Sequence, residues 1–332
     1  MAATGLRGQK VLVTGADGFI GSHLVERLVA DGADVRAFCL YNSMGSAGWL
    51  DEVAPEVRAV LDIRFGDIRD ARLVADATDG TDVVLHLAAL ISIPYSYAAV
   101  ESYLDTNVRG TLNVLEAAKT AGVRRVIQTS TSEVYGTPDT LPIRETHPLR
   151  AQSPYAASKV AADQLALSYQ RSFGVPVVVL RPFNTYGPRQ SPRAVLPAML
   201  RQLIAGEQEI RLGRLDPRRD LTFVRDTVDG FVRAATVEGI EGETIQLGTG
   251  RAESIGELFA MACRLLGSDA QVVQDPVRMR PDASEVMVLQ SDPAVARQLL
   301  GWEATTSLED GLRDTIDWLR GRPAPNHDRA WL

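Results

Sequence analysis

Two short segments near the middle of the chain carry side chains that can exchange protons. The segment STSEVYG contains Thr131, Ser132 and Glu133, which places two hydroxyls beside a carboxylate. Tyr155 and Lys159 follow four residues apart, so on a helix they share one face. An ammonium stabilises a nearby phenolate and lowers the pKa of a tyrosine from its ordinary value of about 10. These residue types predict an acid–base site with Tyr155 as the proton acceptor, whereas an exposed tyrosine on an amphipathic helix is the alternative.

The first 30 residues predict a binding site for the phosphates of a dinucleotide. An apolar strand over residues 10–14 leads directly into the turn GADGFIG, and apolar residues at helical spacing follow over residues 22–30. In such a unit one glycine permits the tight turn, another lets the backbone approach the pyrophosphate, and the third lets helix and strand pack closely. The predicted contacts are Gly15, Gly18, Phe19, Ile20 and Gly21.

Strand and helix patterns then alternate, which predicts an α/β fold with a Rossmann-type doubly wound parallel sheet. Residues 1–181 are the predicted NAD(P)-binding domain. The further strands are expected at 35–40, 62–65, 83–87, 125–129 and 175–180, and the helices at 71–77, 108–121 and 156–169.

The second half of the chain is richer in proline and less regular. Residues 182–321 predict a smaller α/β lobe that binds the substrate over the carboxyl edge of the sheet, with parts of 221–248 returning to the first domain. Short strands are expected at 209–212 and 244–247, and helices at 255–266 and 308–319. Residues 322–332, with two prolines, predict a loosely held tail.

The composition narrows the class of protein. A net charge of −7 gives no basic surface for nucleic acid. No stretch approaches the roughly 18 apolar residues that cross a bilayer, so no membrane contact is expected and a cytoplasmic location follows by default. Cys39 and Cys263 lack neighbours that suggest a disulfide or a metal site, and both are predicted to be core residues.

The GxxGxxG spacing together with Tyr155 and Lys159 resembles the extended short-chain dehydrogenases/reductases. The resemblance implies several further cofactor contacts. An aspartate after the third strand contacts adenine, the end of the fourth strand passes the ribose, and an asparagine that opens the next helix lies near the active site. In this chain the matching residues are Asp67 with Ile68, Leu87, Ala88, Ala89 and Asn107.

The choice between NAD and NADP is less clear from the residues. The second strand ends FCLYN, without the acidic residue that usually binds the ribose 2′-hydroxyl. Arg36 is placed either to meet a 2′-phosphate or to face solvent. NAD is the favoured cofactor, with NADP left open.

The segment STSEVYG is similar to that of nucleotide-sugar 4,6-dehydratases, and its Thr-Ser-Glu looks like the GDP-mannose 4,6-dehydratase version. The resemblance implies that Thr131 and Tyr155 serve oxidation at C4 and that Lys159 tunes Tyr155. Glu133 then removes the C5 proton, and Ser132 assists water loss from C6, after which hydride returns to C6. A structural, salt-bridged role for Glu133 is the alternative.

Rival activities share the same residues. UDP-glucuronate decarboxylases also carry STSEVYG, a 4-epimerase needs only the hydroxyl, tyrosine and lysine, and a 5,6-dehydratase would make an exocyclic alkene. A regulator that binds the cofactor without turnover is disfavoured, because it has no need of Tyr155 and Lys159.

The second half resembles the substrate-binding segments of the same family. Contacts with a diphosphate are implied for the segments RPFNTYGPR, RDLTFVRD and RMRP. For the arginine pair 218–219 the alternative is a solvated run of charges. Segments 41–43, 90–97 and 187–195 look like UDP- or GDP-N-acetylglucosamine 4,6-dehydratases of the legionaminic-acid type, which implies UDP-N-acetylglucosamine as substrate. The implied contacts are Ser92, Tyr95, Asn184, Arg193, Arg219 and Arg280. Family members usually pair through helices matching 108–121 and 156–169, so a homodimer with a four-helix bundle is expected.

Overall fold

A seven-stranded parallel sheet organises the larger part of the chain in the computed structural model, which describes residues 5–322. The strand order is β11-β6-β5-β4-β1-β2-β3, so the order reverses between β1 and β4 and the carboxyl ends of these two strands border a crevice. The strands are β1 (Lys10–Thr14), β2 (Asp34–Leu40), β3 (Asp62–Gly66), β4 (Val83–His86), β5 (Arg125–Thr129), β6 (Val177–Pro182) and β11 (Thr244–Leu247).

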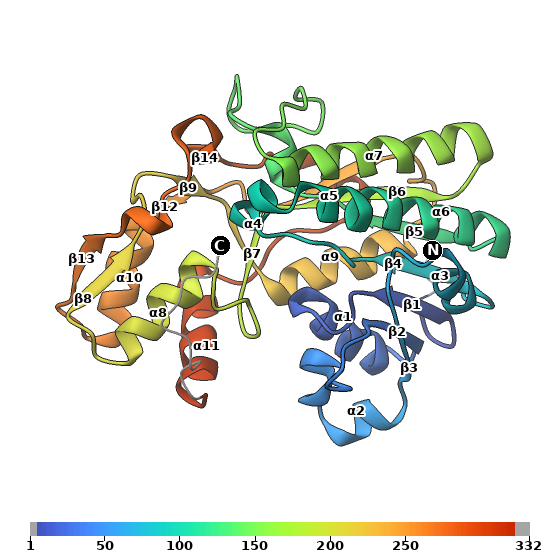
Figure 1. The fold of residues 1–332 in the computed structure, drawn as a ribbon, viewed down its shortest axis with the longest axis horizontal. Coiled ribbons are helices and arrows are strands. Elements are labelled where there is room, and N and C mark those ends of the chain that lie inside the picture. The colour runs from blue at the N-terminus through green and yellow to red at the C-terminus, as the bar shows by residue number, and fades with distance from the viewer. Residues whose placement is uncertain (1–4, 323–332) are drawn as a thin grey trace.

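Helices cover both faces of this sheet (Figure 1). Successive strand residues point to opposite faces, so Val11 and Val13 pack into one core cluster and Leu12 into the other. The first cluster holds α1 (Phe19–Ala30) and α9 (Val224–Thr236), and the second holds α3 (Ala71–Thr78), α6 (Gly110–Ala121) and α7 (Pro154–Phe173). Within residues 5–322 no helix has the length and apolar character needed to cross a membrane. The α/β doubly wound prediction is confirmed.

Several element boundaries differ by a few residues from those predicted, and two of the differences have a clear local cause. The strand expected over residues 175–180 covers Val177–Pro182, because Pro176 has no N–H to donate to a neighbouring strand. Regular helix begins at Gly110 instead of residue 108, because the preceding turn Leu104–Arg109 is π-helical. Such turns occur frequently at functional sites.

The smaller lobe lies beyond the carboxyl edge of the sheet and appears at the left of Figure 1. It contains three small sheets, which pair β7 with β10, β8 with β13, and β9 with both β12 and β14. The strands are β7 (Asn184–Tyr186), β8 (Glu209–Leu212), β9 (Arg218–Arg219), β10 (Leu221–Phe223), β12 (Glu253–Ser254), β13 (Gln271–Gln274) and β14 (Val288–Leu289), and the helices are α8 (Val195–Ile204), α10 (Ile255–Leu266) and α11 (Leu308–Arg320). Short helices elsewhere are α2 (Pro55–Ala59), α4 (Ile93–Ala98) and α5 (Val100–Tyr103).

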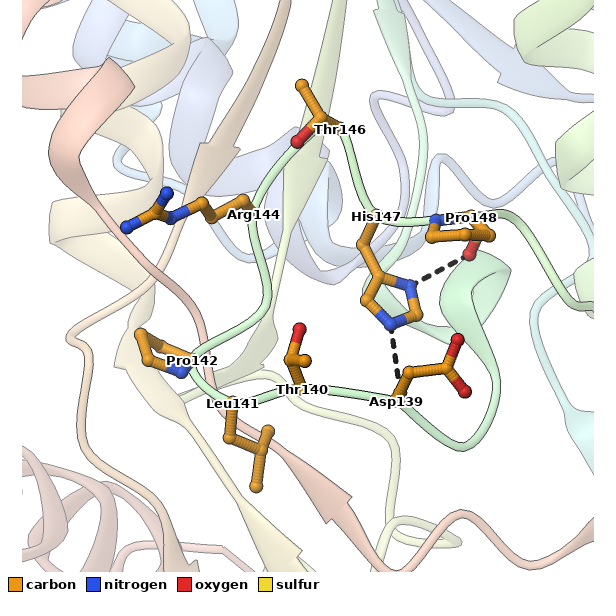
Figure 2. Close-up of a pocket in the computed structure, with 8 residues that line it drawn as sticks. All are labelled: Asp139, Thr140, Leu141, Pro142, Arg144, Thr146, His147 and Pro148. Carbon is orange, nitrogen blue, oxygen red and sulfur yellow. Dashed lines mark hydrogen bonds between the residues drawn. The ribbon is translucent and has the colours of Figure 1, made fainter.

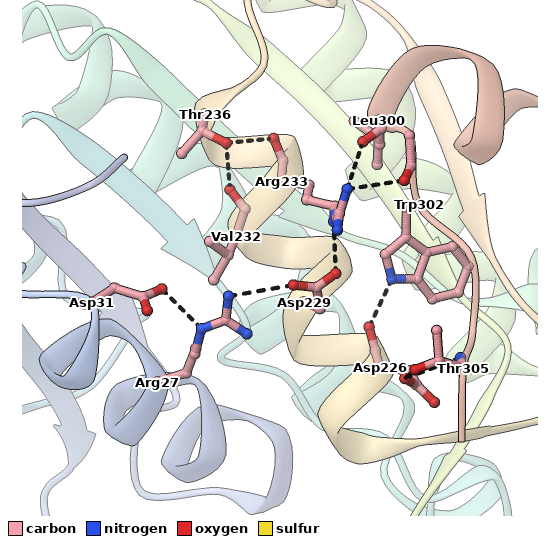
Figure 3. Close-up of polar contacts among 11 residues, drawn as sticks. Arg27, Asp31, Asp226, Asp229, Val232, Arg233, Thr236, Leu300, Trp302 and Thr305 are labelled. Atoms are coloured by element: carbon pink, nitrogen blue, oxygen red, sulfur yellow. Dashed lines mark hydrogen bonds and ion pairs between the residues drawn. The ribbon is translucent and has the colours of Figure 1, made fainter. Parts of the chain in front are cut away.

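Helix α9 joins the two parts of the molecule (Figure 3). On one side Asp229 accepts a hydrogen bond from Arg27 of α1 at 3.3 Å. On the other side the indole N–H of Trp302 donates to the carbonyl of Asp226 at 2.9 Å, and the Asp226 carboxylate accepts the backbone N–H of Thr305. Residues from the second half of the chain thus cover the sheet of the first half.

The start of the predicted tail is held in place, which corrects part of that prediction. The Arg322 guanidinium lies 4.2 Å from the ring centre of Trp318 and 5.2 Å from that of Trp49, and it pairs with Glu52. A cation over an aromatic face is attracted by the ring quadrupole. The rest of the predicted tail, 323–332, lies outside the described residues.

Candidate active site

The predicted acid–base residues lie on the first turns of helix α7. Ser153 caps this helix by accepting the N–H of Ala156 at 3.1 Å, and Pro154 occupies its first position. Tyr155 and Lys159, one turn apart, are only 7% and 5% exposed. The alternative of an exposed tyrosine on an amphipathic helix is therefore wrong.

Lys159 is held by the end of strand β5 and lies near a buried ion pair. Its ammonium donates to the carbonyl of Thr129 at 2.5 Å. One turn further along α7, Asp163 accepts hydrogen bonds from Ser130 at 2.6 Å and from the Arg181 guanidinium at 3.0 Å. Burial lowers the pKa of Lys159 to about 8, and the charge of Asp163 opposes this shift. Asp163 thus helps to keep Lys159 protonated at neutral pH.

Thr131, Ser132 and Glu133 follow strand β5 and form the start of a short 3-10 helix (Ser132–Tyr135). Thr131 is extended, and its hydroxyl accepts the N–H of Glu133 at 3.3 Å. The Glu133 side chain is largely buried, and its Oε1 lies 3.7 Å from Nη1 of Arg280. That nitrogen has no hydrogen-bond partner among the described residues, so the pair is an electrostatic contact and not a direct hydrogen bond.

The protein environment by itself raises the pKa of Tyr155, whereas the predicted lowering requires the positive nicotinamide of an oxidised cofactor as well as Lys159. Burial is the main cause, because it penalises the phenolate, and the charge of Glu133 adds to it. A hydrogen bond with the Thr131 side chain works in the opposite direction. The protein environment by itself therefore favours the protonated form of Tyr155 at neutral pH, with Thr131 as its hydrogen-bond partner.

The backbone around the glycine turn is packed too closely to admit larger side chains at Gly15 and Gly21. Gly15 has a left-handed backbone with φ of 69°, and a Cβ there would lie 2.8 Å from the backbone nitrogen of Ala88. A Cβ on Gly21 would lie 2.1 Å from the carbonyl oxygen of Gly15. Gly18 caps helix α1 without a side chain, so the first N–H groups, which include those of Phe19 and Ile20, are open to an anion. This cradle fits the pyrophosphate of a dinucleotide.

The predicted adenosine contacts follow the carboxyl ends of strands β3 and β4. Asp67 follows β3 and accepts from the N–H of Arg69 at 2.9 Å, as in a turn, while it also pairs with the Arg69 guanidinium at 2.5 Å. Ile68 is buried beneath helix α6. Leu87, Ala88 and Ala89 continue from β4 beside the glycine turn.

Arg36 does not face solvent, and its guanidinium is not free to bind a phosphate, so both expectations for it are wrong. The side chain is only 10% exposed and donates to the Asp62 carboxylate at 2.8 Å. It also donates to the carbonyls of Ala77 and Asp79 at 2.9 Å and 2.8 Å. These partners hold the guanidinium against the end of helix α3.

A hydrogen-bond chain that the sequence analysis missed links the glycine turn to the π-helical turn. Thr14 accepts the N–H groups of Leu87 and Ala88 and contacts Nδ1 of His86 at 2.8 Å, while Nε2 of His86 lies 3.1 Å from the hydroxyl of Thr111. Thr111 donates its own proton to the carbonyl of Asn107 at 2.7 Å. The neutral imidazole must therefore carry its proton on Nε2 and accept from Thr14 on Nδ1.

Asn107 extends this chain to the catalytic helix. Its side-chain amide bonds both the N–H and the carbonyl of Leu90 at 2.9 Å and donates to Ser158, whose hydroxyl donates to the carbonyl of Tyr155. Asn107 thus holds the segment after β4 against the first turn of α7. No residue pattern along the chain signals such a network, because its members come from four segments that are distant in sequence.

The residues predicted to contact diphosphate are partly buried, and their arginines carry the positive charge that suits an anion. Arg219 is buried and pairs with Glu285 at 2.9 Å, so the solvated-run alternative does not hold for it. Glu285 also lies 3.8 Å from Arg280. The side-chain oxygen of Asn184 is buried without a hydrogen-bond partner in the described chain. Glu285, which the sequence analysis missed, lies close to both of these arginines.

The predicted hexose contacts gather around Tyr103. Its buried ring meets that of Tyr155 edge-on at 6.2 Å, and its hydroxyl donates to the carbonyl of Ser92. Tyr95 lies on the other side of Tyr103, at 6.2 Å between ring centres. Burial raises the pKa of Tyr103 to about 12, and the charge of the exposed Arg193 opposes the shift. The sequence analysis missed Tyr103. Its position one helical turn before Asn107 is the sequence feature that could have indicated it.

Comparison with known proteins identifies the family. The profile of the family described as GDP-mannose 4,6 dehydratase matches residues 12–315. The chain belongs to the GDP-mannose 4,6 dehydratase family. A UDP-glucose 4-epimerase of Mycolicibacterium smegmatis is 34% identical and covers 94% of this chain and 99% of its own length. A dTDP-glucose 4,6-dehydratase of Streptomyces antibioticus is 35% identical, covering 97% of this chain and 93% of its own.

Solved structures agree with this family assignment. MoeE5 in complex with UDP-glucose and NAD has a TM-score of 0.83 and 32% identity, and the match covers 94% of this chain and 99% of MoeE5. This member of the GDP-mannose 4,6 dehydratase family is therefore an enzyme of the nucleotide-sugar dehydratase and epimerase group. Dehydratases and epimerases both occur among its relatives, so family membership alone does not choose between them.

A cavity of about 490 Å³ lies in this family member away from the residues discussed above (Figure 2). It is lined by the loop that includes Asp139 and His147. His147 donates to the carbonyl of Pro148 at 2.9 Å and accepts the N–H of Asp139 at 3.0 Å, so its polar atoms serve the loop itself. None of the predicted catalytic residues lines this cavity.

Proposed function

We propose that this chain is a nucleotide-sugar 4,6-dehydratase that uses NAD and acts on UDP-N-acetylglucosamine. The observation that carries the proposal is the position of Glu133. Its carboxylate is buried beside Tyr155 and Thr131, and it faces an arginine without a direct hydrogen bond. A 4-epimerase has no step that needs such a carboxylate.

The first step uses the residues of helix α7. Thr131 hydrogen-bonds the C4 hydroxyl of the sugar, and Tyr155 takes its proton as the C–H bond at C4 breaks. Lys159 supplies the positive charge that favours the phenolate over the phenol, against the effect of burial. A bound NAD supplies the hydride acceptor for C4 and the hydride donor for C6.

The second step depends on Glu133. Once C4 is a ketone, the neighbouring C5–H is acidic, and the Glu133 carboxylate removes that proton. Ser132 passes a proton to the departing C6 hydroxyl and regains the equivalent of the proton that Tyr155 took from C4, so water leaves and a double bond forms between C5 and C6. The proton held by Glu133 exchanges with solvent, and Glu133 then protonates C5 when C6 is reduced. No net oxidation occurs.

The substrate assignment depends on the walls of the site. Leu90 and Ile93 pack around Tyr103 and Tyr155, so the wall next to the reacting carbons is apolar. Such a wall suits the methyl of an acetamido group. Arg219 and Arg280 suit a diphosphate, and a solved relative binds UDP-glucose, which supports a UDP-sugar.

A 4-epimerase is the second candidate. The observation in its favour is that Arg280 lies 3.7 Å from Glu133, so this carboxylate can also serve as half of a structural ion pair. A 4-epimerase would need only Thr131, Tyr155 and Lys159. The epimerase of Mycolicibacterium smegmatis shows that such relatives exist at 34% identity.

Product analysis in heavy water tests the proposal. We expect UDP-N-acetylglucosamine to lose about 18 Da, the mass of one water, and to gain solvent deuterium at C5. An unchanged mass with a product inverted at C4 would establish the epimerase. GDP- and dTDP-hexoses in the same assay test the nucleobase.

The chain is also proposed to act as a homodimer in the cytoplasm. Leu112, on one of the predicted pairing helices, is 37% exposed, and Leu104, in the preceding π-helical turn, is 50% exposed; together with Leu165 they line a cavity of about 280 Å³. An exposed apolar groove of this kind suits a helix-to-helix interface. A monomeric mass by light scattering would contradict the dimer.

A further inference from the structure

NAD and NADP differ only at the ribose 2′-position of their adenosine half. Rossmann folds usually place an acidic residue there at the end of the second strand. In this chain β2 ends at Leu40, and the following Asn42 cannot replace the missing acid. Its side chain accepts the N–H groups of Met44 and Ser46 and donates to the carbonyls of Leu40 and Ser46, so it serves to close the loop.

A carboxylate reaches the end of β2 from another segment. Asp17 lies in the glycine turn after β1, and its Oδ2 accepts the N–H of Leu40 at 3.4 Å. Its backbone carbonyl accepts the N–H of Trp49 at 3.1 Å, and a Cβ on Gly48 would lie 2.5 Å from that carbonyl oxygen. The glycine turn and the loop after β2 therefore enclose Asp17 between them.

The negative charge of Asp17 acts at this strand end. Burial raises the pKa of Cys39, the neighbour of Leu40, to about 12, and the charge of Asp17 is the next largest cause. Burial also raises the pKa of Asp17, but hydrogen bonds from its own N–H and that of Leu40 oppose the shift. These N–H groups stabilise the carboxylate form.

The arginines on this side of the sheet are already paired. Arg36 is committed to Asp62 and lies four residues before Leu40, which separates it from the strand end by roughly 13 Å along β2. Arg58 pairs with Asp51 at 3.5 Å. Neither of these two arginines is therefore free to bind a 2′-phosphate, which would meet the Asp17 carboxylate.

We propose that Asp17 determines the cofactor choice of this enzyme: its carboxylate accepts a hydrogen bond from the adenosine ribose of NAD and repels the 2′-phosphate of NADP. The inference rests on the proposed use of a nicotinamide dinucleotide. A phosphate carries nearly two negative charges at pH 7, and like charges at short range disfavour binding strongly. Selectivity then arises from a repulsive element as well as from an attractive one.

Cofactor displacement tests this without any measurement of turnover. Full-length protein is loaded with NADH, and the loss of nicotinamide fluorescence is followed as NAD or NADP is added. For Asp17→Asn we expect the affinity for NADP relative to NAD to rise by about tenfold or more, because the charge is removed while an acceptor for Leu40 remains. An unchanged ratio would overturn the proposal.

Three further variants make the result specific. Asp17→Ser also removes the charge and should shift the ratio in the same direction, whereas loss of both cofactors in both Asp17 variants would show a role in the turn alone and overturn the proposal. Asp76→Asn makes the same charge change on an exposed part of helix α3 and should leave the ratio unchanged. Asp62→Asn frees Arg36, and a shift as large as that of Asp17→Asn would assign selectivity to Arg36 instead. Wild-type protein that binds neither cofactor would contradict the proposed function itself.

Discussion

At the scale of single residues, burial sets the chemistry of the candidate site more than sequence spacing does. Tyr155 and Lys159 share a helix face as their spacing predicts, yet burial raises the pKa of the first and lowers that of the second. Both shifts favour the neutral forms. The charge of Asp163 favours the protonated form of Lys159 but disfavours the phenolate of Tyr155, so the positive charge that favours proton transfer must come from Lys159 itself and from groups that close around this pair.

Glu133 provides the sharpest test of the reaction. In Glu133→Gln we expect oxidation at C4 to persist, seen as reduced nicotinamide absorbance with UDP-N-acetylglucosamine, while deuterium uptake at C5 and loss of water fall by about 10²-fold or more. The matched variant Ser132→Ala should keep deuterium uptake at C5 and slow only the loss of water. Full dehydration by Glu133→Gln would remove Glu133 from the role of base.

The buried, neutral state of His86 should make the folded protein less stable in acid. Burial lowers its pKa from 6.5 to about 3, so between these values the unfolded chain binds more protons than the folded one. The contribution of His86 is therefore complete above pH 6.5 and declines as the pH falls towards 3. In His86→Gln, urea unfolding at pH 7 should show a loss of about 1–2 kcal/mol but a weaker decline between pH 6.5 and 5. Parallel declines in both proteins would contradict this.

At the scale of elements, the distance to neighbouring backbone decides at which helix starts a glycine is required. Gly21 and Gly256 both lie in the first turn of a helix, α1 and α10 respectively, but their surroundings differ. A Cβ on Gly21 would collide with the carbonyl oxygen of Gly15 at 2.1 Å, whereas the nearest atom to a Cβ on Gly256 lies 3.7 Å away in Leu215. The same residue type therefore has a different role at each position.

Alanine substitutions should separate these two roles. We expect Gly21→Ala to lower the free energy of unfolding by about 1–3 kcal/mol and to weaken NAD binding, because the turn must move. Gly256→Ala should be neutral or stabilising by roughly 0.5–1 kcal/mol, since alanine favours helix. Thermal unfolding and NADH fluorescence measure both effects. Equal behaviour of the two variants would show that space at the turn is not decisive.

At the scale of the whole molecule, buried carboxylates join segments that are distant in sequence. Asp220 is fully buried and accepts hydrogen bonds from the backbone or hydroxyl groups of Thr249, Gly250 and Ser291 at 2.6–3.1 Å. Asp226 connects α9 to the segment before α11 in a similar way. The motif RDLTFVRD thus combines one arginine suited to a ligand with two aspartates that stabilise the lobe.

Loss of the Asp220 charge should loosen this lobe. We expect Asp220→Asn to reduce the free energy of unfolding by about 3 kcal/mol, because an amide offers one oxygen where several donors converge. Asp216→Asn, in the same lobe but 72% exposed and 3.7 Å from its arginine, should change it by less than about 0.5 kcal/mol. Urea unfolding compares the two. A small effect of Asp220→Asn would show that the lobe does not depend on this connection.

Local patterns along the chain were sufficient to predict the sheet, the glycine turn and the face that Tyr155 and Lys159 share. Each depends on residues near one another in sequence, because helix and strand periodicity are local properties. The motif comparison also located Thr131 and Glu133, and the family match confirms the group of enzymes to which they were assigned.

Other features required the folded chain. The pairing of Arg36 with Asp62, the arrival of Asp17 at the end of β2, and the chain from Thr14 through His86 to Asn107 all join segments from different strands and helices. Desolvation, which reverses the expected pKa shift of Tyr155, likewise depends on what packs around the side chain. Burial and contact between distant segments are properties of the packed molecule, so no local pattern could report them.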